Sequence, residues 1–368
     1  MTKKRIEWPV ALFLTINPLV TLILTPVYFY YYGFQLDILL FALIFAAATN
    51  LSITAGYHRL FSHKSYDAHP VAKALFLLVG ASGFQGSALK WSSDHRKHHT
   101  HIDGEKDPYN INEGFWYAHM GWLFFKDSVD QKIVAPDLEK DWMVQFQHKY
   151  YVALAILTGF AVPTLIGWMM GSALGGLVIA GGLRIALTQQ STFFVNSLCH
   201  TLGKQTYSKE ISARDSWFVA VLTHGEGYHN FHHKFQIDYR NGIKWYHWDP
   251  TKWVIKTLNM MGLATKLRQI SNTEILKARL QTEAAELCNK GLCADKLTAV
   301  REKIIEAQNK MKKLRDDYEQ FKVDAGKKRA ELREAYDLKL IEIKREMEIA
   351  KLEFHMGMKQ WRVYARSV

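Results

Sequence analysis

Long apolar stretches dominate the chain before about residue 200, and charged residues dominate the last hundred. Four of these stretches are about 20 residues long, which is enough for a helix to cross the hydrocarbon core of a bilayer. They lie at about 8–32, 38–57, 150–170 and 173–195. The pattern therefore predicts an all-α integral membrane protein with four transmembrane helices. The alternative for these stretches is a set of buried helices in a large soluble core.

The distribution of Lys and Arg predicts how these helices are oriented. The turn at 33–37 and the connection near Gly171 carry neither residue, whereas the N-terminus, residues 58–149 and the chain after 200 contain many. Because positively charged loops stay on the cytoplasmic side, we expect both termini and the segment 58–149 to be cytoplasmic.

The C-terminal region has a different pattern. Apolar residues recur at alternating steps of three and four from Leu297 to Ala325, with charged residues between them. This heptad pattern predicts a coiled coil or an antiparallel helical hairpin, with a break at Gly326 and a second helix from Lys327 to about Phe354. We therefore divide the chain into a membrane domain, 1–265, and a cytoplasmic helical tail, 266–368. The tail either mediates homo-oligomers or packs loosely on the cytoplasmic domain.

The net charge and the cysteine count limit which binding partners and cofactors the chain is expected to have. The formal charge of +12 favours anionic lipid or an acidic protein, and beside four apolar spans it argues against nucleic acid. Three cysteines without a CxxC spacing predict neither a disulfide framework nor an iron–sulfur site.

Histidine spacing provides the candidate chemistry. Two HxxHH arrangements and one HxxxxH occur, and histidines at i, i+3 and i+4 share one face of a helix. The clustered histidines are His58 and His63; His95, His98 and His99; His200; and His229, His232 and His233. Since about four ligands satisfy one metal, nine predict two metals, and imidazole suits Zn, Cu, Fe and Ni alike. The alternative is a pair of basic patches that bind lipid headgroups.

The positions of these clusters predict where the metals lie. His58 ends the second span and His200 follows the fourth, so the site would lie where the bundle opens to the cytoplasm. Asn196, one helical turn before His200, is placed to hold a metal-bound water. The apolar run 71–89 is long enough to span, but spanning would put His63 and His95 on opposite sides. We therefore predict an interfacial or re-entrant helix over 71–89.

These motifs resemble those of the membrane fatty acid desaturases, and most of all the Δ9, stearoyl-CoA-type branch. The matching segments are 58–63, 94–99, 196–200 and 225–233, in the same order and spacing. The resemblance implies a four-helix bundle capped by a cytoplasmic helical domain that holds a di-iron centre. It assigns His58, His95, His99, His229 and, through water, Asn196 to one iron. It assigns His63, His98, His200, His232 and His233 to the other.

The resemblance also implies a reaction. O₂ and two electrons would remove two hydrogens from a saturated acyl chain and leave a cis double bond. Gln85, Trp91 and Thr192 match residues that bend the acyl chain in the family. Acyl-CoA members carry Arg-Asp where this chain has Ser93 and Asp94, so the acyl carrier is either CoA or a glycerolipid. Ala46 stands where some stearoyl-type members close the tunnel with tyrosine.

The electron donor is expected to be a separate protein, because the sequence contains no His-Pro-Gly-Gly haem motif. A cytochrome b5, ferredoxin or rubredoxin with its reductase would fit a basic cytoplasmic face. Two other functions use the same residues: a fatty acid hydroxylase or alkane monooxygenase, and a non-enzymatic metal-binding membrane scaffold.

Overall fold

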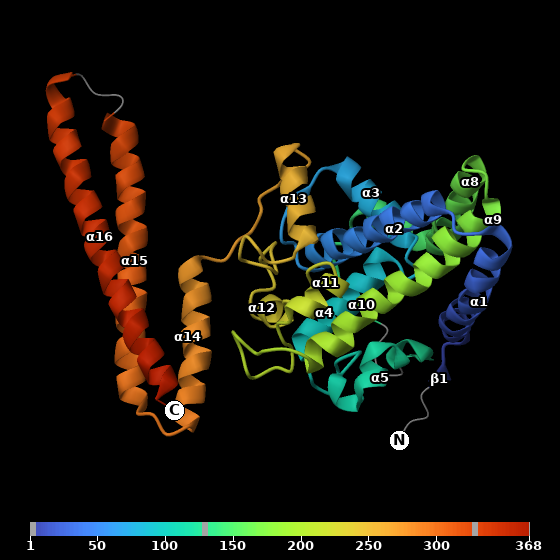
Figure 1. Ribbon diagram of the computed structural model, residues 1–368, viewed down its shortest axis with the longest axis horizontal. Helices are drawn as coiled ribbons and strands as arrows, with labels where there is room; N and C mark the ends of the chain where they lie inside the picture. The colour runs from blue at the N-terminus through green and yellow to red at the C-terminus, as the bar shows by residue number, and fades with distance from the viewer. Residues whose placement is uncertain (1–4, 127–131, 326–329, 368) are drawn as a thin grey trace. The chain divides into compact units, whose positions relative to one another are not determined.

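The computed structural model describes residues 5–126, 132–325 and 330–367 (Figure 1). The chain is predominantly helical and divides into two compact units. Unit 1 comprises Met1–Gln205 and Glu210–Gln269, and unit 2 comprises Thr206–Lys209 and Ile270–Val368.

Long apolar helical segments form the bundle of unit 1. The first is α1 (Trp8–Tyr32), and the second is α2 (Leu36–Leu51), which continues as the π-helix η1 (Ser52–Ser62). The third consists of α7 (Tyr151–Ile156), the π-helix η4 (Leu157–Ala161) and α8 (Val162–Met169). The fourth consists of α9 (Ala173–Gly175), the π-helix η5 (Gly176–Leu183) and α10 (Arg184–Thr201).

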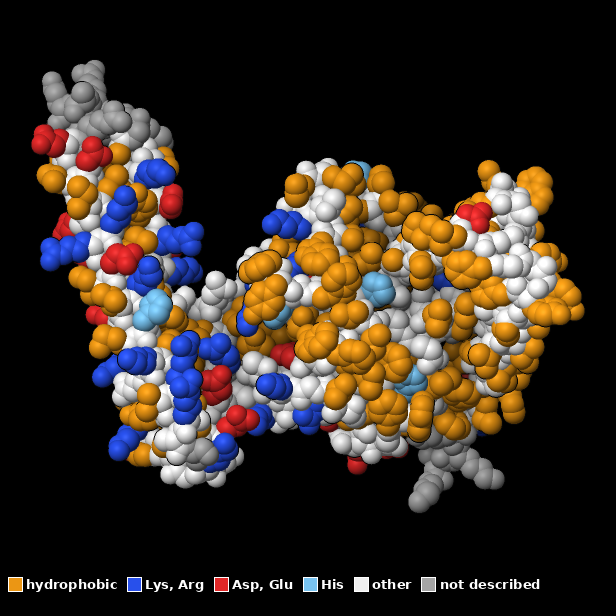
Figure 2. Space-filling view, in the orientation of Figure 1, with side chains coloured by type: hydrophobic (Ala, Val, Ile, Leu, Met, Phe, Trp, Pro, Cys, Tyr) orange, Lys and Arg blue, Asp and Glu red, His pale blue; other side chains and the backbone are white. Residues whose placement is uncertain are grey.

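Within the described residues, three helices are long and apolar enough to cross a membrane: Trp8–Tyr32, Leu36–Ser62 and Tyr151–Met169. They coincide with the first three predicted spans, and Figure 2 shows hydrophobic side chains over much of the visible face of unit 1. The fourth predicted span, 173–195, is helical but more polar. Its Arg184, Thr188 and Gln189 are each 1% exposed, so these polar groups point into the bundle rather than toward lipid.

Small residues and one buried arginine hold this fourth segment in place. A Cβ on Gly167 would lie 2.5 Å from the Cα of Gly176, so α8 and η5 pack backbone against backbone. The Arg184 guanidinium donates to the carbonyls of Ser82 and Gly159 at 3.1 to 3.2 Å. These bonds tie the fourth segment to the turn that follows α3 and to η4 of the third segment.

The predicted helix 71–89 is two helices in the structure: α3 (Pro70–Ala81) and α4 (Ala88–His101). The turn between them includes Phe84 and Gly86, which have φ angles of 51° and 91°. The Ser87 hydroxyl accepts a hydrogen bond from the backbone N–H of Lys90 and so caps the start of α4. The predicted single helix was wrong because the sequence stays apolar through the turn, and apolarity alone does not show where the chain changes direction.

Short elements complete unit 1. They are α5 (Phe115–His119), α6 (Trp142–Lys149), α11 (Trp217–Leu222), α12 (His229–Lys234), α13 (Pro250–Met260), and the 3₁₀ turns η2 (Ile111–Glu113) and η3 (Gly121–Phe124). Two antiparallel strand pairs join distant segments: β1 (Arg5–Ile6) with β3 (Phe125–Lys126), and β2 (Asp67–Ala68) with β4 (Ala264–Thr265). A core that includes Tyr57, Phe61 and Phe76 packs η1 against α3 and fixes the base of the site.

Unit 2 consists of α14 (Asn272–Asn289), α15 (Ala294–Ala325) and α16 (Ala330–Arg366). Leu297, Val300, Ile304 and Leu314 of the predicted ladder are buried against neighbouring helices. The second tail helix does not end near Phe354 as predicted but continues to Arg366, because the apolar spacing persists through the buried Trp361. The predicted break at Gly326 and helix start at Lys327 lie outside the described residues.

Candidate metal centre and its cavity

The nine clustered histidines converge in unit 1, although they come from four separate segments. Their ligand atoms form two groups, and within each group these atoms lie within 4.8 Å of one another. The first group is His58, His63, His95, His99 and His232, and the second is His98, His200, His229 and His233. Each group could hold one metal ion.

This grouping differs from the division that the resemblance implies. His63 and His232 lie with the first group, and His229 lies with the second. Spacing along the chain could not assign them, because neighbouring histidines on one helix face point to different groups. His98 and His99 are adjacent residues of α4, yet they belong to different groups.

Four histidines have their outer ring nitrogen held by another side chain. His58 Nδ1 lies 3.0 Å from Glu226 Oε2, and His98 Nδ1 lies 2.8 Å from Asp107 Oδ1. His95 Nδ1 lies 3.1 Å from the Tyr109 hydroxyl, and His200 Nδ1 lies 2.7 Å from the Ser212 hydroxyl. Metal-binding histidines typically have such partners, which fix the ring orientation and the tautomer.

The tautomers leave lone pairs facing one another in the centre of each group. A carboxylate only accepts, so His98 Nδ1 carries the proton and His98 Nε2 carries a lone pair. His58 Nε2 lies 3.0 Å from His232 Nε2, and His98 Nε2 lies 3.3 Å from His233 Nε2. His200 Nε2 is buried with no hydrogen-bond partner in the described structure. Converging lone pairs in a buried site fit bound cations, so the residues present fit two metal ions.

The protonation state of these histidines also suits metal binding. Burial, followed by the proximity of other histidines, lowers the pKa of six of them well below the usual value: His63, His95, His99, His229, His232 and His233. They therefore stay neutral at physiological pH, and only the neutral ring can bind a metal.

A buried ionic network supports the first group. Glu226 is 2% exposed and accepts hydrogen bonds from Arg59 (2.9 Å) and Asn241 (2.6 Å). Arg59 also donates to Asp249 at 3.0 and 3.2 Å. Burial by itself would raise the pKa of Glu226, but His58 and Arg59 outweigh that effect and lower it to about 2. The carboxylate thus stays charged beside His58.

The sequence analysis did not identify Glu226, Asp107, Tyr109 or Ser212. Glu226 lies within the segment 225–233, three residues before His229, so its place in the motif was a usable signal. Asp107, Tyr109 and Ser212 follow no spacing rule, because loops bring them to the histidines.

A cavity of about 690 Å³ adjoins both histidine groups. His58 and His95 from the first group line it, as do His98 and His229 from the second. Much of the remaining wall is apolar and comes from α1, η1, α7 and α10. The volume lies within the range of about 300–1,000 Å³ that is typical of small-molecule sites.

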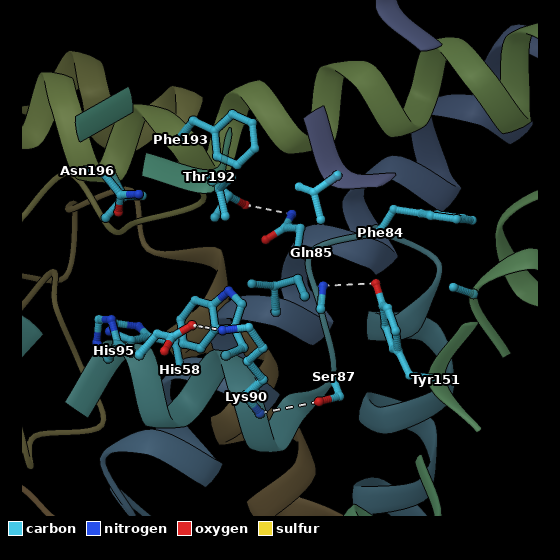
Figure 3. A pocket seen from close by; sticks show the side chains of 18 of the residues that line it. His58, Phe84, Gln85, Ser87, Lys90, His95, Tyr151, Thr192, Phe193 and Asn196 are labelled. Atoms are coloured by element: carbon cyan, nitrogen blue, oxygen red, sulfur yellow. Dashed lines mark hydrogen bonds and ion pairs between the residues drawn. The ribbon is translucent and has the colours of Figure 1, made fainter. Parts of the chain in front are cut away.

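The predicted substrate residues Gln85, Trp91, Asp94 and Thr192 all line this cavity, as does Asn196. Gln85, Thr192 and Asn196 are labelled in Figure 3. Gln85 Nε2 donates to the Thr192 hydroxyl at 2.9 Å, which closes one side of the cavity. The Trp91 ring stacks on His95 with 5.0 Å between centroids. Asp94 accepts from Lys90 Nζ at 2.9 Å. Ser93 is buried and accepts from the backbone N–H of Val134, so it does not line the cavity.

Comparison with known proteins agrees with a membrane protein that has a histidine-rich metal site beside an apolar cavity. Residues 36–263 match the sequence model of a family described as fatty acid desaturase. The chain is 43% identical over 259 residues to acyl-CoA desaturase 1 of Saccharomyces cerevisiae, an alignment that covers 70% of this chain and 51% of that protein. This chain therefore spans about half the length of the yeast relative.

Two other relatives differ in the acyl carrier that their names state. Stearoyl-CoA desaturase 5 of Bos taurus is 37% identical over 248 residues, covering 66% of this chain and 74% of that protein. The sn-1 stearoyl-lipid 9-desaturase of Anabaena variabilis is 34% identical over 228 residues, covering 61% and 82%.

Proposed function

Because this chain belongs to the fatty acid desaturase family, we propose that it is an O₂-dependent fatty acyl desaturase that introduces a cis double bond, at Δ9, into a saturated acyl chain. The observation that carries the proposal is the position of the histidines. Two from each group line one largely apolar cavity, so an acyl chain in that cavity would lie against both metal sites.

The histidines would hold two iron ions. The first group would bind one ion through five imidazoles. The second would bind the other through four. Asn196, which the resemblance assigns to the iron held by His58, His95 and His99, lines the same cavity and would contact that ion through water. Iron at such a site supplies the O₂-dependent removal of hydrogen from an unactivated carbon, with two electrons from outside the chain.

The protein itself would bind and orient the acyl chain. Apolar side chains such as Phe13 and Ile53 exclude water from the cavity, and the Gln85–Thr192 hydrogen bond and the Trp91 ring restrict its shape near His58 and His95. A fixed position of the chain against the metals would explain a fixed position of the double bond.

The acyl carrier is proposed to be CoA, in line with the names of the yeast and bovine relatives. Lys90 and Lys149 line the cavity and could pair with phosphate. A glycerolipid remains the alternative, because the stearoyl-lipid relative is nearly as similar.

We place the enzyme in a membrane with four spans, with both termini and the metal site cytoplasmic. Three apolar helices support the membrane location, and the distribution of Lys and Arg supports the orientation. Electrons would come from a separate cytochrome b5, ferredoxin or rubredoxin with its reductase.

Expression in a host that lacks the activity, followed by fatty acid analysis with double-bond location, tests the proposal. We expect new cis-Δ9 products with the wild-type chain and none with His98→Ala, which removes a ligand of the second group. His355→Ala, on the tail surface, is the matched control and should leave the products unchanged.

Other results would overturn the proposal. Hydroxylated products would instead establish a monooxygenase. Bound metal without O₂ consumption, in the presence of donor and lipid, would favour a metal-binding scaffold.

A further inference from the structure

Asp103 lies in the loop that follows α4, and its carboxylate holds a second loop of unit 1. Its Oδ2 atom accepts a hydrogen bond from the backbone N–H of Ser212 at 2.7 Å, and its Oδ1 atom accepts one from the Ser212 hydroxyl at 2.5 Å. Ser212 belongs to the segment between α10 and α11 and stands 109 positions away in the sequence. The two bonds therefore join loops that only the fold brings together.

Asp103 is itself held by its own loop. Its φ angle is 61°, a left-handed conformation that Asp adopts more readily than most residues. Its backbone N–H donates to Asp107 Oδ2 at 3.0 Å, and its carbonyl accepts from Asn112 Nδ2 at 2.9 Å. The backbone of this loop therefore fixes the position from which the carboxylate reaches Ser212.

The hydrogen-bond chain from Asp103 sets the tautomer of His200. A carboxylate has no hydrogen to donate and a hydroxyl has one, so Ser212 donates to Asp103 and can only accept from His200 Nδ1, which lies 2.7 Å away. His200 Nδ1 lies 4.0 Å from Asp103 Oδ1, so the two residues are linked through the hydroxyl. A neutral ring, the form that binds a metal, carries one proton, and that proton is then on Nδ1. His200 Nε2 carries the lone pair.

The same loop sets the orientation of His98. Asp107 Oδ1 lies 2.8 Å from His98 Nδ1, and Asp107 Oδ2 accepts from the backbone of Asp103. His98 comes from α4 and His200 from α10, yet both belong to the second histidine group. The loop after α4 thus orients one ligand of that group directly and another through a second loop.

We propose that Asp103 is a positioning residue of the second histidine group, and that it acts through Ser212 to direct the Nε2 lone pair of His200 toward a metal ion. This role rests on the metal ions of the proposed function. His200 Nε2 is buried without a hydrogen-bond partner among the described residues, which leaves its lone pair available to a cation. Partners that stand behind metal ligands typically change metal affinity or activity by about 10–100-fold.

Asp103→Asn should reverse the hydrogen-bond chain. The amide has one accepting oxygen and one donating nitrogen. When its oxygen keeps the backbone N–H of Ser212, its NH₂ group donates to the Ser212 hydroxyl, which then donates to His200 Nδ1. The proton of the neutral ring moves to Nε2, where it blocks the metal. The opposite placement of the amide would set its NH₂ group against the backbone N–H, and two donors repel each other.

Binding of Co²⁺ to the purified, metal-free full chain in detergent tests the proposal, with a competing chelator to measure the affinity of each site. We expect two Co²⁺ ions per chain in the wild type. Asp103→Asn should weaken one of them by about 100-fold and leave the other unchanged. Ser212→Ala removes the hydroxyl without reversing the chain and should weaken the same ion by about tenfold. The double variant should also lose only about tenfold, because the amide cannot reach His200 without the hydroxyl.

Two variants serve as controls. Glu105→Gln makes the same charge change at an exposed position of the same loop and should bind Co²⁺ as the wild type does. Ser212→Thr keeps the hydroxyl and should also retain both ions. Circular dichroism of each metal-free variant shows that it folds. If Asp103→Asn does not fold, the comparison of Ser212→Ala with Ser212→Thr tests the hydroxyl link on its own.

The possible results separate this role from the proposed function. Wild-type affinity in Asp103→Asn, or a double variant whose loss is the product of the two single losses, would overturn the role of Asp103. Equal weakening of both sites would show that Asp103 supports the fold alone. A wild type that binds two Co²⁺ ions but, loaded with iron, makes no unsaturated fatty acid would contradict the desaturase activity and not this role. A wild type that binds no Co²⁺ would contradict both.

Discussion

The backbone N–H of His63 donates to the carbonyl of His58 at 3.1 Å, which is an i to i+5 bond. In an α-helix, residues five apart point about 140° away from each other at 3.6 residues per turn. The wider π-helical turn of η1 brings them onto one side, with ring centroids 4.8 Å apart. An HxxxxH spacing thus becomes a pair of ligands for one metal, as π-bulges at functional sites often allow.

Arg96 should be needed to keep this turn. Its guanidinium donates to the carbonyls of Phe61 (2.7 Å) and Ser62 (3.0 Å) at the end of η1, and it pairs with Asp137. We expect Arg96→Met to destabilise the protein by about 2–4 kcal/mol and to lower metal content, since charged hydrogen bonds are worth about 1.5–3 kcal/mol each. Thermal unfolding in detergent and metal analysis measure both effects.

Lys64→Met is the matched control for Arg96. Lys64 also pairs with Asp137, but its side chain is 51% exposed, and such pairs contribute about 0–1 kcal/mol. If both variants lost equal stability, the role of Arg96 in holding the π-helical turn would be wrong.

Glu226→Gln should weaken metal binding without unfolding the chain. The neutral amide still fills the space but no longer provides the negative charge that faces His58 Nδ1 and Arg59. Loss of such a partner typically lowers metal affinity or activity by about 10–100-fold. Competition with a chelator measures the affinity, and Glu139→Gln on the exposed surface is the control. Unchanged affinity would show that Glu226 supports the fold alone.

The two histidine groups should differ in how much metal they lose when one histidine is replaced. His63→Ala leaves four histidines in the first group, whereas His229→Ala leaves three in the second. Since about four ligands satisfy a transition metal, we expect His229→Ala to lose about one metal per chain and His63→Ala to lose less. Metal analysis after gel filtration measures this. The reverse order would contradict the grouping that the structure gives.

Metal-free protein should lose stability in acid. Six site histidines have a folded pKa well below the unfolded value of about 6.5, so below that pH the unfolded chain binds more protons. Stability then falls as pH falls, by up to about 1.4 kcal/mol per histidine for each pH unit, and these groups add no dependence above pH 7. Melting temperatures of chelated protein between pH 8 and 5 test this, and a flat profile would show that folding does not lower the pKa of these histidines.

Thr192→Val should change the products more than Thr192→Ser. The valine removes the hydroxyl that accepts from Gln85, and an unsatisfied buried amide costs about 1–3 kcal/mol. We expect Gln85 to move and the double-bond position or chain-length preference to broaden. Serine keeps the hydroxyl and serves as the control. Identical product profiles for all three proteins would rule out the Gln85–Thr192 bond as a determinant of the bend.

The sequence by itself predicted three apolar spans that the structure confirms, as well as the heptad ladder and the nine clustered histidines. Apolar segments of about 20 residues and helix-period spacing are local patterns, so they are visible without a fold. Residue type also limited the chemistry, because clustered imidazoles favour transition metals. Residues such as Gln85 and Trp91 came from the resemblance, and the structure places both in one cavity with His58.

The tertiary structure decided what depends on distant contacts. It broke the apolar run 71–89 into two helices, joined by a turn that includes Phe84 and Gly86. The Phe84 ring packs against Gly159, where a Cβ would lie only 2.5 Å from it, and this contact joins residues far apart in the sequence. The tertiary structure also assigned His229 to the second group, and it supplied Glu226 and Asp107 behind the histidines. Ligand sets and their carboxylate partners depend on where loops and helix faces meet in space. Spacing within a single segment, even in His95-Arg96-Lys97-His98-His99, does not contain that information.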